Sequence, residues 1–224
     1  MDFSELDELG FGLVSGVITF AEIEEIRQRL PNLDGVAGTR NLLMSDWCRE
    51  LAADLRLINL VQAAIGSNAK AVRAILFDKT SEANWTLGWH QDTKIAVRRK
   101  AETAGFSAWS EKEGVVHCQP PVEVLDRSMA VRIHIDQSGS ENGPLRVIPG
   151  SHRAGIQSEV DQTRISNAVE CFAESGDVIL MKPLLWHASS KSLRPEQHRR
   201  VIHIEYCAAD LPGGLEWAYR VSLQ

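Results

Sequence analysis

Between residues 71 and 207 the chain alternates between short segments rich in Val, Ile and Leu and tight clusters of turn-forming residues. These clusters include Asn142-Gly143-Pro144, Pro149-Gly150-Ser151 and Ser175-Gly176-Asp177. About eight short strands separated by such turns are typical of a double-sheet β fold. The segments expected to form strands are 71–77, 85–97, 122–125, 129–135, 145–148, 168–172, 177–181 and 200–207.

Residues 1–70 have a different pattern, which predicts a mostly helical region. Thr19, followed three residues later by Glu22, indicates a capping box at the start of a helix. Apolar residues recur at helical spacing over 46–65 and predict a second helical stretch with one buried face. A short strand is expected near 11–14. This region is expected to pack as a support against the β core.

The length of 224 residues fits a single domain spanning 1–224. Within it we expect helical support over 1–70 and a β core over 71–208. The segment 98–121 is the one long stretch without a clear strand pattern. Loops of that length inside a compact domain are usually lids, binding loops or disordered segments, so we predict a lid loop here.

Composition excludes several classes of protein. A net charge of −6 provides no basic surface for nucleic acid, and no apolar run is long enough to span a membrane. The acidic start, Met1-Asp2-Phe3-Ser4-Glu5, lacks an apolar signal region. Cys48, Cys118, Cys171 and Cys207 form no CxxC pair, as expected for reduced thiols. These features predict a cytoplasmic protein and leave its oligomeric state open.

A His followed two residues later by a carboxylate occurs three times, as His90-Gln91-Asp92, His134-Ile135-Asp136 and His203-Ile204-Glu205. Residues two apart on a strand share a face, so each pair could bind one metal ion. Two His and one carboxylate on one side of the ion are typical of non-haem Fe(II) oxygenases. The first pair follows an aromatic strand end, where functional residues are frequent. The other two lie in Val- and Ile-rich strands, which is more typical of polar residues lining a barrel.

Several motifs occur in an order that carries a family resemblance. In chain order they are His90-Gln91-Asp92, Asn142-Gly143-Pro144-Leu145, Ile148-Pro149-Gly150-Ser151-His152, Gly176-Asp177, His187 and Arg199. This set resembles the phytanoyl-CoA dioxygenase family of Fe(II)/2-oxoglutarate-dependent oxygenases over roughly residues 70–208. The resemblance implies a double-stranded β-helix, a cupin-like jelly roll with the N-terminal helices packed on one sheet.

Carried over position by position, the resemblance makes His90, Asp92 and His187 the iron ligands and the catalytic centre. It also implies that O2 and 2-oxoglutarate bind on the open side of the metal. His152, in the Pro-Gly-Ser-His turn, has a structural role in the family and is not expected to bind metal.

The resemblance further assigns the binding of 2-oxoglutarate. Arg199 matches the basic residue that pairs with the distal carboxylate, a task suited to a planar guanidinium. Arg200 is the alternative, because adjacent residues on a strand face opposite ways. Ser189 and Lys79 match a hydroxyl and a lysine that help to hold the cosubstrate, although Lys79 could equally be a solvated strand-end residue.

Five further residues are expected to contact the substrate. Trp89 and Trp109 suggest a partly apolar pocket, with ordinary core packing as the alternative for each. His117 lies in the expected lid. Arg132 and His134 share a strand face and could meet a substrate carboxylate if that face lines the barrel.

The expected activity is that of a dioxygenase that hydroxylates an unidentified small molecule and releases succinate and CO2. The carboxylate of Asp92 favours hydroxylation, since relatives that halogenate lack it. Two alternatives stay open: a cupin-type metal-binding dioxygenase or isomerase that does not use 2-oxoglutarate, and a non-catalytic jelly-roll binding module. The fold and the cofactor do not determine the substrate.

Overall fold

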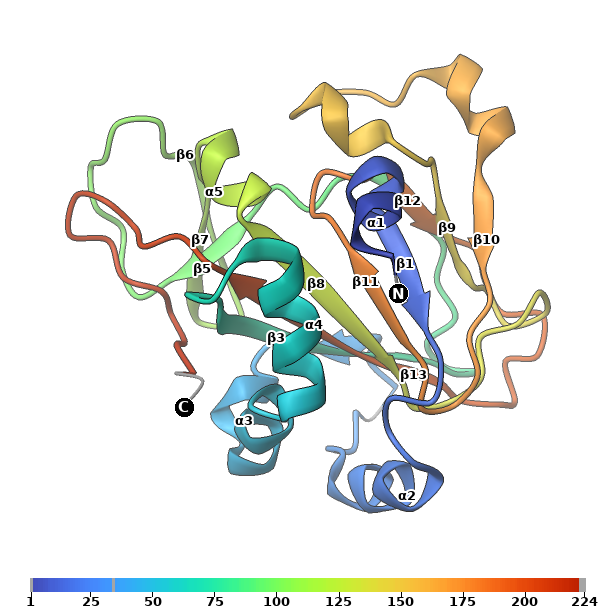
Figure 1. Cartoon of the computed structure of the whole chain (residues 1–224). Coiled ribbons are helices and arrows are strands. Elements are labelled where there is room, and N and C mark those ends of the chain that lie inside the picture. The colour runs from blue at the N-terminus through green and yellow to red at the C-terminus, as the bar shows by residue number, and fades with distance from the viewer. Residues whose placement is uncertain (1, 34, 222–224) are drawn as a thin grey trace.

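The computed structural model describes residues 2–33 and 35–221, and Figure 1 shows the course of the chain. The named strands of these ranges form three antiparallel sheets of six, four and three strands. The large sheet has the order β1-β11-β8-β13-β3-β2. Its strands are β1 (Phe11–Val14), β2 (Gly38–Thr39), β3 (Lys70–Lys79), β8 (Ser128–His134), β11 (Val178–Met181) and β13 (Arg199–Cys207).

Two smaller sheets complete the β structure. The four-stranded sheet has the order β10-β9-β12-β4, and the three-stranded sheet has the order β5-β7-β6. The first contains β4 (Leu87–His90), β9 (Leu145–Val147), β10 (Val169–Cys171) and β12 (His187–Ser189). The second contains β5 (Ile95–Val97), β6 (Ser107–Lys112) and β7 (Val115–Gln119).

Helices lie mainly in the N-terminal third of the chain, and Figure 1 shows α4 in front of the large sheet with α3 below it. The α-helices are α1 (Phe3–Leu9), α2 (Phe20–Arg29), α3 (Asp46–Ala52), α4 (Leu55–Ile65) and α5 (Val122–Asp126). Short 3-10 helices cover η1 (Leu42–Met44), η2 (Ser151–Ala154) and η3 (Gln162–Asn167). None of the helices in the described ranges is long and apolar enough to cross a membrane.

The two faces of the large sheet differ in chemistry. We call the face that packs against the helices the outer face and the opposite one the inner face. Outer-face residues such as Ile202 and Ile204 belong to an apolar cluster that also contains Ile23 of α2 and Leu57 of α4. Side chains alternate along a strand, so the residues between them, such as His203, lie on the inner face.

Several predicted elements are confirmed. β1 forms at 11–14 as expected. The capping box at the start of α2 is complete: the Glu22 N–H donates to the Thr19 hydroxyl, and the Thr19 N–H donates to the Glu22 carboxylate. The helical stretch predicted over 46–65 consists of two helices, α3 and α4.

Other predicted elements are wrong. The segment 122–125 is the helix α5 rather than a strand, because Val124 and Leu125 turn into an apolar cluster beside the third sheet. The expected strand 85–97 is broken into β4 and β5, which belong to different sheets. That break places the residues after His90 at a strand end.

The segment 98–121 was expected to be irregular, but it contains the hairpin β6–β7. Glu113 and Gly114 at its turn both have positive φ, of 51° and 74°. Tight hairpins favour such angles, usually with Asn-Gly or Asp-Gly, so a Glu-Gly pair is a weak signal in sequence. A lid function for this segment stays a prediction.

Candidate metal centre

His90 and His187 are direct neighbours across two antiparallel strands, β4 and β12. Their ring centroids lie 4.0 Å apart. Nδ1 of His90 lies 2.8 Å from the Gly88 carbonyl oxygen, and Nδ1 of His187 lies 2.8 Å from the Leu185 carbonyl oxygen. A carbonyl oxygen can only accept, so each Nδ1 carries the proton and each Nε2 keeps a free lone pair. This is the usual orientation of a histidine that binds metal.

Asp92 brings a carboxylate to the same point. It follows the end of β4, and its N–H donates to the Pro183 carbonyl oxygen at 2.8 Å. Its Oδ2 lies 3.6 Å from Nε2 of His187 and its Oδ1 lies 4.0 Å from Nε2 of His90. The three ligand atoms all lie within 4.8 Å of one another. Two imidazoles and one carboxylate in this arrangement fit a divalent metal such as Fe(II).

The protonation states suit a metal. Burial lowers the pKa of His187 to about 4, against the opposing charge of Asp92, so its imidazole is neutral at neutral pH. Burial alone raises the pKa of Asp92, but the charges of His187, His203 and His90 outweigh it and hold the pKa well below its usual range. A neutral imidazole and a charged carboxylate are the forms that bind metal.

The three residues open into a cavity between the two larger sheets, which we call the central cavity. The empty space that its lining residues enclose is about 470 Å³, which includes the part open to solvent. Its polar lining residues are His90, Asp92, Arg132, His187, Ser189, Arg199 and His203. Its apolar lining residues are Ile75, Phe77, Trp85, Leu87, Leu145 and Ala188.

Arg199 faces the central cavity, and Arg200 faces away from it. The Arg200 guanidinium donates to both carboxylate oxygens of Asp136, at 2.7 and 2.9 Å. Arg199 is buried, and its Nε and Nη1 have no hydrogen-bond partner in the part of the chain that the structure describes. Buried guanidinium groups are normally paired, so Arg199 fits an anion from outside the chain.

Lys79 and Ser189 lie beside Arg199. Lys79 is the cross-strand neighbour of Arg199, between β3 and β13. Its Nζ donates to the Ser189 hydroxyl at 2.5 Å and to the Ser190 carbonyl oxygen. Burial and the charges of Arg199 and Arg132 lower the pKa of Lys79 to about 7. Lys79 is fully buried, so the alternative of a solvated lysine is wrong.

The residues expected to contact substrate are distributed differently. Arg132 lines the central cavity, but Trp89 and Trp109 do not. Trp89 packs under the Arg146 guanidinium, 5.3 Å from it, and Trp109 packs against the apolar cluster that contains α5 residues. Contact of either tryptophan with a substrate stays a prediction.

His117 and His134 are buried. Nδ1 of His117 contacts the Val115 carbonyl oxygen at 2.9 Å, while its Nε2 has no described partner. His134 has no described partner at either ring nitrogen, and burial together with Arg132 and Arg199 lowers its pKa to about 3. Neither histidine lines the central cavity.

The sequence interpretation gave too little weight to His203 and Glu205. They lie on the inner face of β13, where Glu205 pairs with Arg73 and accepts from His203, whose Nε2 lies 3.5 Å away. His203 also lines the central cavity. Alternation along the strand was the available signal, since residues 199, 203 and 205 share one face once Arg199 faces the cavity.

Solved structures with this fold bind metal and cosubstrate. The α-ketoglutarate-dependent epimerase SnoN from nogalamycin biosynthesis is 16% identical, with a TM-score of 0.68 over 95% of this chain and 86% of that chain. HygX from Streptomyces hygroscopicus, with nickel and 2-oxoglutarate bound, is 20% identical, with a TM-score of 0.67 over 92% and 86%. EctD from S. alaskensis, with bound Fe, is 18% identical, with a TM-score of 0.68 over 92% and 75%.

These likenesses confirm the predicted jelly-roll fold with N-terminal helices. A search among curated proteins gives no match. Residues 6–200 match the phytanoyl-CoA dioxygenase (PhyH) family, a span that covers most of the chain and all three potential metal ligands. The chain is therefore a member of the phytanoyl-CoA dioxygenase family.

Proposed function

We propose that this protein is a non-haem Fe(II)- and 2-oxoglutarate-dependent dioxygenase that hydroxylates a small molecule. One observation carries the proposal: the same cavity is lined by three potential metal ligands and by Arg199, whose Nε and Nη1 have no partner among the described residues. A metal site alone would leave the guanidinium of Arg199 unexplained. A dicarboxylate cosubstrate accounts for the metal ligands and for Arg199, because one of its ends can bind the metal and the other can pair with the guanidinium.

His90, Asp92 and His187 would hold the iron, and Arg199, Ser189 and Lys79 would hold the cosubstrate. When bound, ferrous iron and 2-oxoglutarate supply the oxidising chemistry, which consumes O2 and releases succinate and CO2. The contribution of the chain is orientation. Arg199 can grip a carboxylate through two parallel hydrogen bonds, and the Ser189 hydroxyl, fixed by Lys79, can add another donor.

The apolar lining of the central cavity would keep water from the reacting groups. Phe77, Trp85 and Leu145 are among these apolar lining residues. Exclusion of water strengthens the interactions of Arg199 with a carboxylate, because the local dielectric constant is low.

The solved structures support the binding of a metal and 2-oxoglutarate more strongly than they support hydroxylation of the substrate. HygX was solved with nickel and 2-oxoglutarate, and SnoN with Fe3+, α-ketoglutarate and nogalamycin RO. SnoN is an epimerase. Stereochemical inversion is therefore the second candidate, and product mass separates the two, because hydroxylation adds an oxygen atom and epimerisation does not.

The test is anaerobic titration of the apo-protein with Fe(II) and 2-oxoglutarate, followed by the visible absorption of the complex and the release of succinate in air. We expect His187→Ala to abolish metal binding, whereas His198→Ala, which alters an exposed histidine beside Asp78, leaves it unchanged. Arg199→Leu should weaken 2-oxoglutarate binding about 10- to 100-fold. Arg200→Leu is its control, with stability measured in parallel.

Other outcomes identify the alternatives. A protein that binds Fe(II) through His187 but has no affinity for 2-oxoglutarate would be a cupin-type enzyme without that cosubstrate. A protein that binds neither would be a non-catalytic module. Either result contradicts the proposal.

A further inference from the structure

Arg132 is a second buried guanidinium on the inner face of the large sheet. It lies on β8 opposite His203 of β13, with its guanidinium carbon 5.8 Å from the centre of the Phe77 ring. Its single hydrogen bond among the described residues runs from Nη1 to Nδ1 of His203, at 3.0 Å. Its Nε is buried and has no acceptor. A carboxylate can accept two parallel hydrogen bonds from Nε and Nη2, which form one edge of the guanidinium.

Nothing in the described chain neutralises this cation at close range. No described carboxylate lies within ion-pair distance of Arg132, whereas Arg73 on the same face pairs with Glu205 and Arg200 pairs with Asp136. A buried guanidinium without a carboxylate partner destabilises the fold. A group of this kind at the wall of a cavity is typical of a ligand site.

Arg132 and Arg199 both line the central cavity, at different positions along the large sheet. Along β13, Arg199 and His203 are separated by four residues, which corresponds to about 13 Å. Because Arg132 pairs with His203 across β8 and β13, its backbone lies about that distance from Arg199 along the sheet. Burial lowers the pKa of Arg132, and the charge of Asp92 opposes this shift. Burial and the charge of Arg132 lower the pKa of Arg199 to about 9, and the charge of Asp78 opposes that shift.

The cosubstrate does not account for Arg132. A dicarboxylate bound as proposed places one carboxylate at the metal and the other at Arg199. A metal ion would also engage Asp92, which lines the same cavity as Arg132. The loaded site would then keep an excess of positive charge at Arg132.

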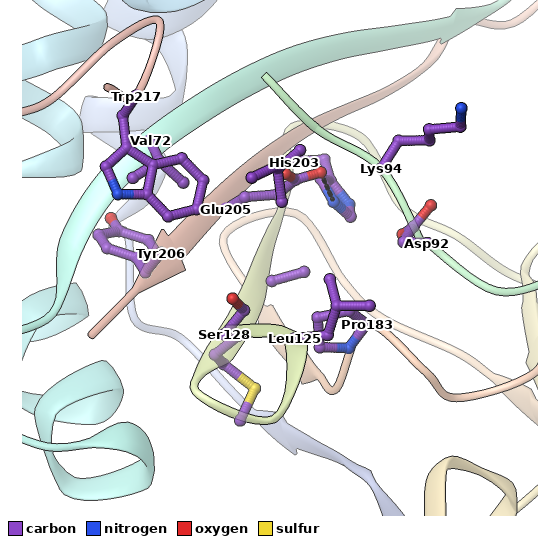
Figure 2. A pocket seen from close by; sticks show the side chains of 13 residues that line it. Val72, Asp92, Lys94, Leu125, Ser128, Pro183, His203, Glu205, Tyr206 and Trp217 are labelled. Atoms are coloured by element: carbon purple, nitrogen blue, oxygen red, sulfur yellow. Dashed lines mark ion pairs between the residues drawn. The ribbon is translucent and has the colours of Figure 1, made fainter. Parts of the chain in front are cut away.

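A second pocket adjoins this point, and we call it the apolar pocket. It shares Asp92 and His203 with the central cavity. Figure 2 shows Asp92 and Lys94 on one side of it and Trp217 on the other, with the ion pair between His203 and Glu205 between them. Most of its other lining residues are apolar: Val72, Ile95, Leu125, Met129, Pro183 and Trp217.

We propose that the substrate is an organic carboxylate with an apolar body, whose carboxylate pairs with Arg132 while the body extends into the apolar pocket. This inference rests on the proposed function and names the substrate class of the same site. It makes Arg132 a specificity-determining residue. His203 positions it, because the bond to Nδ1 holds the guanidinium with its other edge free.

The experiment uses the full chain loaded with Ni(II) and 2-oxoglutarate, so that no turnover occurs. Ligand-observed NMR measures the binding of matched pairs, hexanoate against hexanamide and phenylacetate against phenylacetamide. We expect the carboxylate of at least one pair to bind about tenfold more tightly than its amide. Arg132→Met should remove that preference, and Arg132→Gln, which keeps a donor for His203, should also remove it.

Arg146→Met is the matched control, since Arg146 lies on β9 and packs over Trp89 instead of lining either pocket. It should keep the preference. Thermal melting of the apo-protein gives a readout that needs no substrate. Arg132→Met should raise the melting temperature because an unpaired buried cation is removed, whereas Arg73→Met should lower it because Glu205 loses its partner.

Three results would overturn the inference. The first is that carboxylates and amides bind alike to the wild type, or that neither binds at millimolar concentration. The second is a carboxylate preference that survives in Arg132→Met, and the third is a loss of 2-oxoglutarate affinity in Arg132→Met, which would assign Arg132 to the cosubstrate. Failure of the proposed function is distinct, because the wild type would then not bind 2-oxoglutarate at all.

Discussion

The two faces of the large sheet are made by the same strands and have opposite chemistry. On β13, Ile202 and Ile204 pack into the apolar cluster under the helices, while His203 and Glu205 face the interior of the barrel and bind Arg132 and Arg73. The outer face stabilises the fold through apolar burial. The inner face carries charges that are costly to bury. Strand alternation therefore separates the face that stabilises the fold from the face that carries the proposed function.

The inner face itself contains two kinds of arginine. Arg73 is paired with Glu205, whereas Arg132 and Arg199 have no carboxylate partner in the described chain. We interpret Arg73 as a structural group, and Arg132 and Arg199 as groups that bind anionic ligands. Substitutions at these positions and on the outer face should separate the two kinds of group.

Breaking the buried pair should have the largest effect on stability. Arg73→Met leaves the Glu205 carboxylate buried without its partner and should lower the free energy of unfolding by about 3–5 kcal/mol. Urea unfolding measures the loss. The double variant Arg73→Met/Glu205→Leu should regain much of it, and a double variant no more stable than the single one would contradict a paired structural role.

Truncation of the outer face should destabilise the protein without altering the site. Ile202→Ala removes a fully buried side chain under the helices and should cost about 2–5 kcal/mol of unfolding free energy. Below the unfolding temperature the affinity for metal should stay that of the wild type. A folded Ile202→Ala protein with impaired metal binding would show that the two faces are not separable.

Lys79, on the inner face, should make the stability of the protein depend on pH. Its pKa falls from 10.5 to about 7 on folding, so the folded state releases the proton more readily than the unfolded state. The stability of the wild type should therefore be lowest, as far as this group is concerned, below about pH 7 and should rise between about pH 7 and pH 10. Lys79→Met should flatten that rise.

Melting temperatures at about pH 6 and about pH 9 provide the check. The variant should gain several degrees over the wild type at the lower pH and less at the higher pH. An equal difference at both values would mean that Lys79 does not change its protonation on folding.

The smallest expected effect concerns a helix cap far from the cavity. Thr19→Ala removes the hydroxyl that caps α2, a helix whose Ile23 and Ile26 join the outer-face cluster. Loss of such a cap costs about 1 kcal/mol. Chemical denaturation should detect it, and 2-oxoglutarate affinity should not change. Thr19→Ser, which keeps the hydroxyl, should resemble the wild type.

Local patterns in the sequence were sufficient for the fold class and for the pair His90 and Asp92, and the family resemblance added His187 and Arg199 to the candidate site. Alternation and turn residues predicted the β core, and the spacing of Thr19 and Glu22 predicted a cap that the structure contains. The pair His90 and Asp92 was visible as a motif, because both ligands lie on one short segment. These features depend on residues close together in the chain, so their geometry follows from backbone periodicity.

The contacts between groups that are distant in the chain depend on the tertiary structure. The register of β4 against β12 brings His187 to His90, and the register of β13 against β3 and β8 places Arg199 beside Lys79 and His203 beside Arg132. Periodicity assigns a side chain to a face but says nothing about its neighbour on another strand. That neighbour depends on strand order and register, which the packing of the whole domain determines.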